Sequence, residues 1–224
     1  MATTLKKVVH VEIILKDEAL IHDEKEFLAL ITKKLQITHP ILTEMEVSIP
    51  GLREIGEVIE RMSITDVGPS RSVPFWDAEL FLHVYKLIDG SAEKDYLDGD
   101  DDLAACLQTE LPSRELHGLW DSIIVEDHIK RTLCGYCAST IQFSAASIDP
   151  TIISWNRIIL LHGPPGTGKT SLCRSLAQKT FIRHNDRYAT SLLLEISSHS
   201  LFSKYFSESG KKVVKLFDHS AYSI

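Results

Sequence analysis

The chain of 224 residues is 44% hydrophobic and 25% charged, which is ordinary for a globular protein and excludes fibrous and disordered classes. No apolar run approaches the roughly 20 residues that span a bilayer, and the first residues lack the apolar core of a secretion signal, so we expect an intracellular protein without a membrane partner. Residues 1–105 hold 11 Lys and Arg against 21 Asp and Glu, a net −10, and residues 106–224 hold 13 against 10, a net +3, so nucleic acid is not expected as the partner of the acidic first half.

The first half of the chain reads as a small α/β domain. Residues 8–15 alternate between two faces, with Val9, Val11, Ile13 and Leu15 on one of them, which predicts a strand. A helix is expected next, because apolar residues recur at helical spacing and acidic residues precede them. The apolar positions of that helix are Phe27, Leu28, Ile31 and Leu35, after Asp23 and Glu24.

Further strands are expected at 45–49 and 79–88, whereas 52–62 fits either a short helix or a strand. The stretch 89–102 is acidic and poor in apolar residues, so it reads as a linker or surface loop, with a partner-binding tail as the alternative. We therefore predict an N-terminal recognition domain over 1–105 and a second domain over 106–224.

The second domain is expected to start with a helix near 127–143, in which apolar residues recur at every fourth position. Cys134 and Cys137 lie on this helix, and two small buried thiols are the simpler interpretation of the pair than a redox or zinc site. The ten histidines show no metal-ligand spacing, so they are interpreted as structural or surface residues.

The sequence Gly163-Pro164-Pro165-Gly166-Thr167-Gly168-Lys169-Thr170 fits the phosphate-loop pattern G-x-x-x-x-G-K-[ST]. The apolar run 158–161 before it reads as a buried parallel strand, and 170–179 after it reads as a helix, so the required order is present. Glycines let the backbone N–H groups face a phosphate, and the helix start adds positive charge. By the logic of the motif, Lys169 reaches the β- and γ-phosphates of ATP and the Thr170 hydroxyl coordinates Mg²⁺.

A second buried strand is expected at 192–196, which with 158–161 would complete a β-α-β unit in a parallel sheet. The predicted fold class is therefore α/β: a small α/β N-terminal domain followed by a partial P-loop domain with a parallel sheet.

The run from Trp155 to Ala177 resembles the AAA+ ATPases, whose usual loop is G-P-P-G-T-G-K-T. Two further stretches, 115–122 and 198–211, are similar to the pachytene checkpoint ATPase family, also called thyroid-receptor-interacting protein. That resemblance implies ring hexamers that use ATP to remodel HORMA-domain proteins with a HORMA-type adaptor, in meiosis and the spindle checkpoint, in the nucleus and cytoplasm.

The resemblance also implies roles for individual residues. Gly118 and Leu119 would lie near the adenine, and Ser171 would extend the phosphate-binding loop. Lys204, Tyr205 and Phe206 would form the central-pore loop that grips a translocating peptide; the alternative is an amphipathic helix start that buries Phe206.

The sequence departs from the family after Ile196, where no strand ending in Asp-Glu follows. No catalytic residue is therefore assigned, and we expect a shortened form or fragment that binds ATP but hydrolyses it inefficiently, with hexamer formation in doubt. The alternative is a non-catalytic module that binds HORMA proteins or adaptors and modulates full-length rings. A P-loop kinase or GTPase is disfavoured, because neither an acceptor site nor a guanine-reading motif is present.

Overall fold

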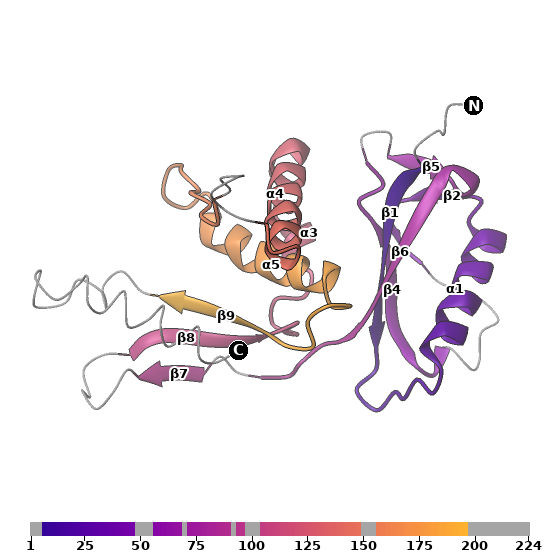
Figure 1. Cartoon of the computed structure of the whole chain (residues 1–224), viewed down its shortest axis with the longest axis horizontal. Helices are drawn as coiled ribbons and strands as arrows, with labels where there is room; N and C mark the ends of the chain where they lie inside the picture. Colours follow the sequence, from indigo (N-terminus) through magenta and orange to yellow (C-terminus); the bar gives the residue numbers. More distant parts are fainter. Residues whose placement is uncertain are drawn as a thin grey trace, which may run out of the picture.

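The computed structural model describes residues 6–47, 56–68, 71–90, 93–96, 104–148 and 156–196. Its N-terminal part is a four-stranded sheet in the order β3-β4-β1-β6, with one helix on its outer face (Figure 1). β1 (Lys7–Leu15) lies at its centre, parallel to β6 (Ala78–Lys86) and antiparallel to β4 (Ile59–Thr65). The strands expected at 8–15 and 79–88 are confirmed, and the undecided segment 52–62 contributes its last residues to β4.

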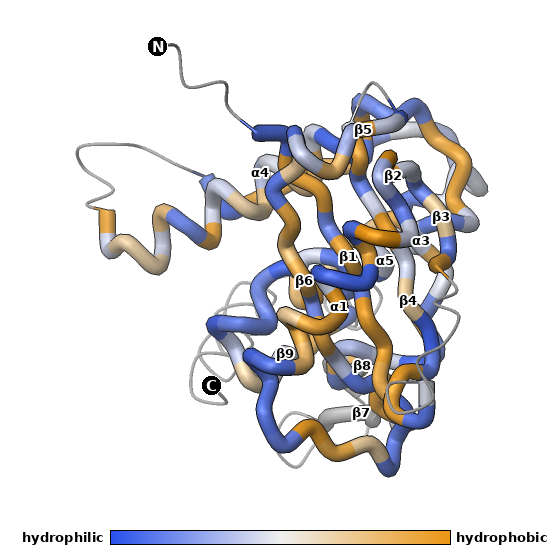
Figure 2. Tube along the Cα trace, turned by 90° about the vertical axis from the view of Figure 1, so that its right-hand side faces the viewer, coloured by the Kyte–Doolittle hydropathy of each residue, from blue (hydrophilic) through white to orange (hydrophobic). Residues whose placement is uncertain are grey.

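Helix α1 (Glu24–Thr38) covers one face of this sheet. Asp23 caps it by accepting a hydrogen bond from the Glu26 backbone N–H at 3.0 Å, which satisfies one of the free donors of the first turn. Ile31 and Leu35 are fully buried against the odd-numbered side chains of β1, as the alternation in the sequence predicts. Hydrophobic segments accordingly run along β1, interrupted by hydrophilic ones that belong to its other face (Figure 2).

Three short strands complete the N-terminal part. β3 (Met45–Glu46) pairs with β4 at the sheet edge, so the strand expected at 45–49 is present at its start, and 48–49 lie outside the described residues. β2 (Ile41–Thr43) pairs antiparallel with β5 (Ser72–Pro74), which a single 3-10 turn, η1 (Phe75–Asp77), joins to β6. The core of this part therefore lies between α1 and the sheet.

The described residues of the second part form three helices and a three-stranded sheet. The helices are α3 (Leu119–Ser122), α4 (Asp127–Ala145) and α5 (Lys169–Arg183), and the sheet has the order β7-β8-β9. Its strands are β7 (Glu93–Tyr96), β8 (Ala104–Leu111) and β9 (Ser191–Ile196). The helices expected near 127–143 and 170–179 are confirmed, and so is the mixed α/β class.

The prediction that 158–161 and 192–196 pair as parallel strands is wrong for the part of the chain that the structure describes. Residues 158–161 form no strand there, and Ile158 and Leu160 are 75% and 87% exposed. The strand at 192–196 exists as β9, but it pairs antiparallel with β8. Strand character is local, whereas the choice of partner depends on which strands lie within reach, and β8 was not anticipated.

The acidic stretch 89–102 is not wholly a loop. Its residues 93–96 form β7 and pair antiparallel with β8, although most of the remaining positions lie outside the described residues. β8 begins at Ala104, so the predicted boundary between residues 105 and 106 falls inside a strand. The division into two domains stays a prediction. No helix among the described ranges is long and apolar enough to cross a membrane.

Candidate nucleotide-binding site

The loop from Gly163 to Gly168 leads directly into helix α5. Gly166 and Gly168 both have φ of +78°, a left-handed conformation that side chains disfavour, and Gly168 is the N-cap of α5. A Cβ built at either glycine meets no atom within 4 Å, so the backbone alone requires glycine here. Open space over a helix start with free N–H groups is the arrangement that accepts a phosphate.

Lys169 lies over this loop. Its Nζ donates to the Gly163 carbonyl oxygen at 3.0 Å and to the Pro164 carbonyl oxygen at 2.5 Å, and the Thr167 hydroxyl also donates to Pro164 at 2.9 Å. The ammonium group is thus held on the same side as the loop backbone, within reach of an anion there. Thr170 follows in the first turn of α5 and is exposed, so its hydroxyl could be the one protein ligand of a Mg²⁺ ion otherwise held by phosphates and water.

Helix α5 is held by apolar contacts along its first half. Leu172 and Leu176 are buried in a cluster with Leu133 of α4, against which Leu161 and Trp120 also pack. Arg174 pairs with Glu195 of β9, Nε to Oε1 at 2.8 Å, and this bond raises the pKa of the guanidinium. The loop is therefore carried by a helix that contacts α4 and β9.

The residues expected near the adenine lie at the start of α3. Gly118 is its N-cap with φ of +74°, and Leu119 packs against a cluster of Leu111, Leu116 and Phe181. This cluster contains Phe181 from the last turns of α5 and no residue of its first turn. The adenine assignment stays a prediction, and the pore-loop residues 204–206 lie outside the described residues.

The two cysteines of α4 behave as structural thiols. Cys134 and Cys137 are free and partly buried on α4, and burial raises the pKa of Cys134 to about 11. A thiol with so high a pKa is a poor nucleophile at neutral pH. Within the described ranges no cluster of three metal-ligating side chains occurs.

The far end of α5 packs on the face of the N-terminal sheet that α1 leaves free (Figure 1). Ile182 is buried with Ile14, Tyr85 and Leu87. Beside it, Lys179 Nζ lies 2.5 Å from Glu12 Oε1, with 6% and 11% of the two side chains exposed. Sequence reasoning missed this contact, although an acidic residue inside the apolar strand 8–15 was a signal that a buried partner exists.

Charges in this contact shift several pKa values. Burial alone would raise the pKa of Glu12, but the charge and hydrogen bond of Lys179 and the charge of Arg183 bring it below its ordinary value. Arg183 pairs with Asp66, and burial lowers the pKa of its guanidinium to about 10. Glu12 and Arg183 are therefore ionised and largely removed from water at the end of α5.

Two histidines border the ion pairs. His10 Nδ1 lies 2.9 Å from His83 Nε2, and their rings stack with centroids 5.2 Å apart. Burial, followed by the charge of Arg183, lowers the pKa of His10 to about 2, and burial also lowers that of His83. Both imidazoles are therefore neutral at physiological pH. They line a cleft of about 1450 Å³ between the sheet and helices α4 and α5.

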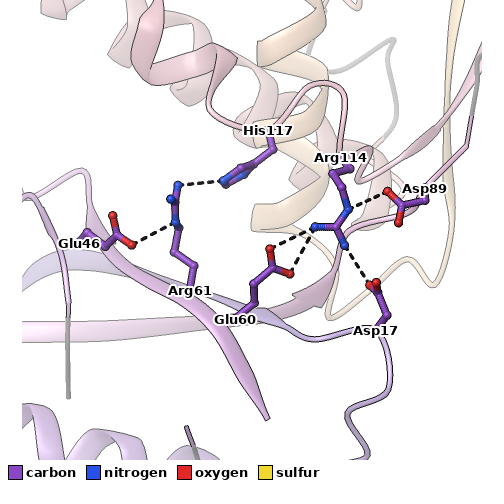
Figure 3. A network of polar contacts seen from close by, with 7 residues as sticks. All are labelled: Asp17, Glu46, Glu60, Arg61, Asp89, Arg114 and His117. Atoms are coloured by element: carbon purple, nitrogen blue, oxygen red, sulfur yellow. Dashed lines mark hydrogen bonds and ion pairs between the residues drawn. The ribbon is translucent and has the colours of Figure 1, made fainter. Parts of the chain in front are cut away.

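Arg114 makes a second polar contact between the two parts, just before α3 (Figure 3). Its guanidinium bonds the carboxylates of Asp17, Glu60 and Asp89 at 3.0, 3.1 and 2.7 Å. Three residues further on, His117 Nε2 lies 3.2 Å from Arg61 Nη1. The segment that leads to Gly118 is thus fixed to the N-terminal part by side chains that sequence reasoning did not single out.

Two family models match the chain, one over each part. Residues 4–90 match the TRIP13 N-terminal domain, and residues 159–223 match the ATPase family associated with various cellular activities (AAA). Pachytene checkpoint protein 2 homologues are similar: the zebrafish (Danio rerio) protein is 49% identical over 159 residues, which is 71% of this chain and 38% of that protein. The rice (Oryza sativa subsp. indica) protein is 50% identical over 145 residues, 64% of this chain and 30% of that protein.

The solved structure of C. elegans PCH-2 covers 96% of this chain with a TM-score of 0.72 and 32% identity. The chain belongs to the pachytene checkpoint protein 2 family. This agrees with the family resemblance carried by the phosphate loop and its flanking stretches. The aligned regions span only about a third of the length of the curated Pch2 relatives and 55% of the C. elegans PCH-2 chain. The activity and partners of a whole Pch2 protein therefore come to this chain only as proposals.

Proposed function

We propose that the chain binds ATP with Mg²⁺ at residues 163–171, as the nucleotide-binding part of a Pch2-type AAA ATPase. The observation that carries this proposal is the pair of left-handed glycines, Gly166 and Gly168, at the start of a 15-residue helix. They leave the loop N–H groups open to a phosphate, and Lys169 and Thr170 follow at the positions that meet the outer phosphates and the metal.

The glycines provide the experiment. Alanine at Gly166 or Gly168 would have to adopt a left-handed conformation at a cost of about 1–2 kcal/mol, or shift the loop. We expect binding of a fluorescent ATP analogue to weaken by about tenfold, since 1.4 kcal/mol is a factor of ten. Gly135→Ala is the matched control, because Gly135 lies within α4 and an added Cβ there meets nothing within 4 Å. Equal affinity in all variants would contradict the proposal.

The N-terminal part is proposed to recruit HORMA-domain proteins and a HORMA-type adaptor, in the nucleus and cytoplasm, within the homo-hexamer that the resemblance implies for full-length members of the family. Support comes from the match of residues 4–90 to the TRIP13 N-terminal domain and from the family resemblance. The test is binding of a purified HORMA-domain protein to the chain by biolayer interferometry, with and without the adaptor. A chain that lacks residues 1–90 should not bind, and equal binding by that control would overturn the assignment.

Binding and hydrolysis of ATP are proposed to be unequal in these 224 residues. Phosphoryl transfer needs groups that orient the attacking water and meet the charge on the γ-phosphate, and an arginine finger alone contributes about 10³–10⁵ in rate. Residues 197–224 contain no adjacent Asp-Glu pair that could serve this purpose. Phosphate release should stay near that of a Lys169→Ala blank, and rapid release that depends on Lys169 would show otherwise.

A further inference from the structure

Both segments that are expected to hold the nucleotide are attached to the N-terminal sheet. Helix α5 starts at Lys169 in the phosphate loop, and Lys179 contacts Glu12 ten residues later. At 1.5 Å per residue these two positions lie about 15 Å apart along one continuous helix. The other segment, 113–119, ends at Gly118 and Leu119 and is tied to the sheet by Arg114.

The two segments are also tied to each other. Gln178 of α5 accepts a hydrogen bond from the Ser113 backbone N–H at 2.9 Å through its Oε1, and both residues are buried. The backbone of 112–114 in turn bonds Ile88, two residues after the end of β6. Ile88 N–H donates to the Pro112 carbonyl at 2.8 Å, and Arg114 N–H donates to the Ile88 carbonyl at 3.1 Å. The sheet, the segment 113–119 and α5 therefore form one connected set of contacts.

The contacts at this interface make both favourable and unfavourable contributions to its free energy. Burial of Ile182 against Ile14, Tyr85 and Leu87 stabilises it. The buried pair of Lys179 and Glu12 contributes little net stability, because desolvation of two charges cancels most of their attraction. Arg183 Nε is buried without a hydrogen-bond partner, which costs further free energy. Ion pairs with little net stability leave the docked and undocked states closer in free energy than apolar contacts would, so a ligand that favours one state can shift their populations.

The phosphate loop depends on this interface for its position. In a parallel sheet the strand before the loop would anchor it, but 158–161 form no strand in the structure. Among the described elements, the loop is positioned by Leu161, which packs on the cluster between α4 and α5, and by α5 itself. Helix α5 in turn is held by α3, α4, β9 and the N-terminal sheet. Loss of the contact with the sheet would therefore leave the loop less well ordered for a phosphate.

We propose that docking of the N-terminal sheet on α5 and on segment 113–119 pre-organises the nucleotide site, so that docking and nucleotide binding favour each other. Because coupling of two binding equilibria is reciprocal, a variant that undocks the sheet weakens nucleotide binding by the same factor by which nucleotide strengthens docking. This inference rests on the proposed nucleotide binding and adds its regulation by the N-terminal domain. Couplings of this kind amount to about 5–150-fold in affinity, and we expect the lower end.

The test uses charge reversal across the interface in the full chain. Glu12→Lys and Lys179→Glu each place like charges against one another, and the double variant E12K/K179E restores an opposite pair. Arg114→Ala is a milder variant at an exposed site, which serves if the buried changes prevent folding. Arg187→Ala is the matched control, since Arg187 follows α5 and pairs only with its neighbour Asp186 among the ion pairs of the described residues.

Two measurements are made on each protein: small-angle X-ray scattering for docking, and isothermal titration with Mg·ADP and with Mg·AMPPNP. We expect the single reversals and R114A to enlarge the radius of gyration and to raise the Kd at least fivefold, with recovery in the double variant and no change in R187A. Undocked variants that bind both nucleotides like wild type would overturn the coupling while leaving nucleotide binding intact. Unchanged scattering and unchanged Kd would show that these contacts do not hold the sheet. Absence of binding by wild type itself would overturn both proposals.

Discussion

Lys179 Nζ on helix α5 lies 2.5 Å from Glu12 Oε1 on strand β1, although the two residues are 167 positions apart in the sequence. The pair joins the helix that starts at the phosphate loop to the central strand of the N-terminal sheet. Its side chains are almost completely buried, so neither charge can be lost without leaving the other uncompensated.

The first prediction concerns this pair and the stability of the chain. Lys179→Met should lower the free energy of unfolding in urea by about 3 kcal/mol, because the Glu12 carboxylate then stays buried without its main partner. The double variant E12Q/K179M should recover at least half of that loss, since no unpaired charge remains.

A lysine on the surface provides the control for that comparison. Lys33 is exposed on α1, so Lys33→Met should change the free energy of unfolding by no more than about 0.5 kcal/mol. If K179M and K33M had equal effects, the Lys179–Glu12 contact would not be a buried ion pair in solution.

The second prediction is a loss of stability below neutral pH. In the folded chain the pKa values of His10 and His83 lie below 6.5, so between pH 6.5 and 5 the unfolded chain binds more protons than the folded one. The free energy of unfolding therefore falls as the pH is lowered through this window, by up to about 2 kcal/mol per histidine at pH 5. The pKa of Glu12 is lowered from its ordinary value of 4.5, so its titration affects the free energy of unfolding only at lower pH and does not contribute in this window.

The pH effect is checked by urea denaturation at pH 7.5 and 5.0. The charged and titratable groups that face His10 are Arg183, Lys179, His83 and His184. The double variant H10Q/H83Q should show a smaller difference between the two pH values than wild type. A wild-type stability that is equal at both values would mean that the two imidazoles are exposed in solution.

Local features of the fold could be predicted from the sequence. The alternation of residues 8–15 places the odd-numbered side chains under α1, and Asp23 caps that helix as its position suggests. The glycine pattern before Lys169 predicts a loop at a helix start, and the structure has one. Each of these depends on neighbours in the chain, which a sequence shows directly.

Long-range features could not be predicted in the same way. The strand at 192–196 was identified, but its partner β8 was not, because Ala104–Leu111 follows an acidic stretch that was interpreted as a linker. Arg114 and Lys179 look like ordinary surface cations in the sequence. Only the fold brings Asp17, Glu60 and Asp89 around the former and Glu12 against the latter.

The third prediction concerns the contact between Lys169 and the outer phosphates of the nucleotide. Lys169→Ala should weaken binding of Mg·ATP more than binding of Mg·ADP, because the ammonium group chiefly meets the β- and γ-phosphates. Isothermal titration of both nucleotides measures the two changes. Lys33→Ala on α1 is a control of the same charge, because Lys33 is exposed. Equal binding by wild type and K169A would show that Lys169 does not contact the nucleotide.

The last prediction is that residues 1–90 fold without the rest of the chain. Their sheet and α1 enclose a core of their own, in which Val9, Val11, Ile13, Ile31 and Leu35 are fully buried. Residues 4–90 match the family model of the TRIP13 N-terminal domain. A fragment that ends at 90 also avoids β8, which begins at Ala104 and pairs with β9.

The isolated fragment should nevertheless expose one surface that is covered in the full chain. Ile14, Tyr85 and Leu87 lose their cover when Ile182 is absent, which exposes an apolar patch on the free face of the sheet. We expect a dispersed amide NMR spectrum together with self-association at high concentration. Leu87→Glu should reduce the self-association without changing the dispersion, because Leu87 lies outside the core under α1. A collapsed spectrum for both fragments would show that the N-terminal sheet needs α5 in order to fold, and the boundary between the two domains would then be wrong.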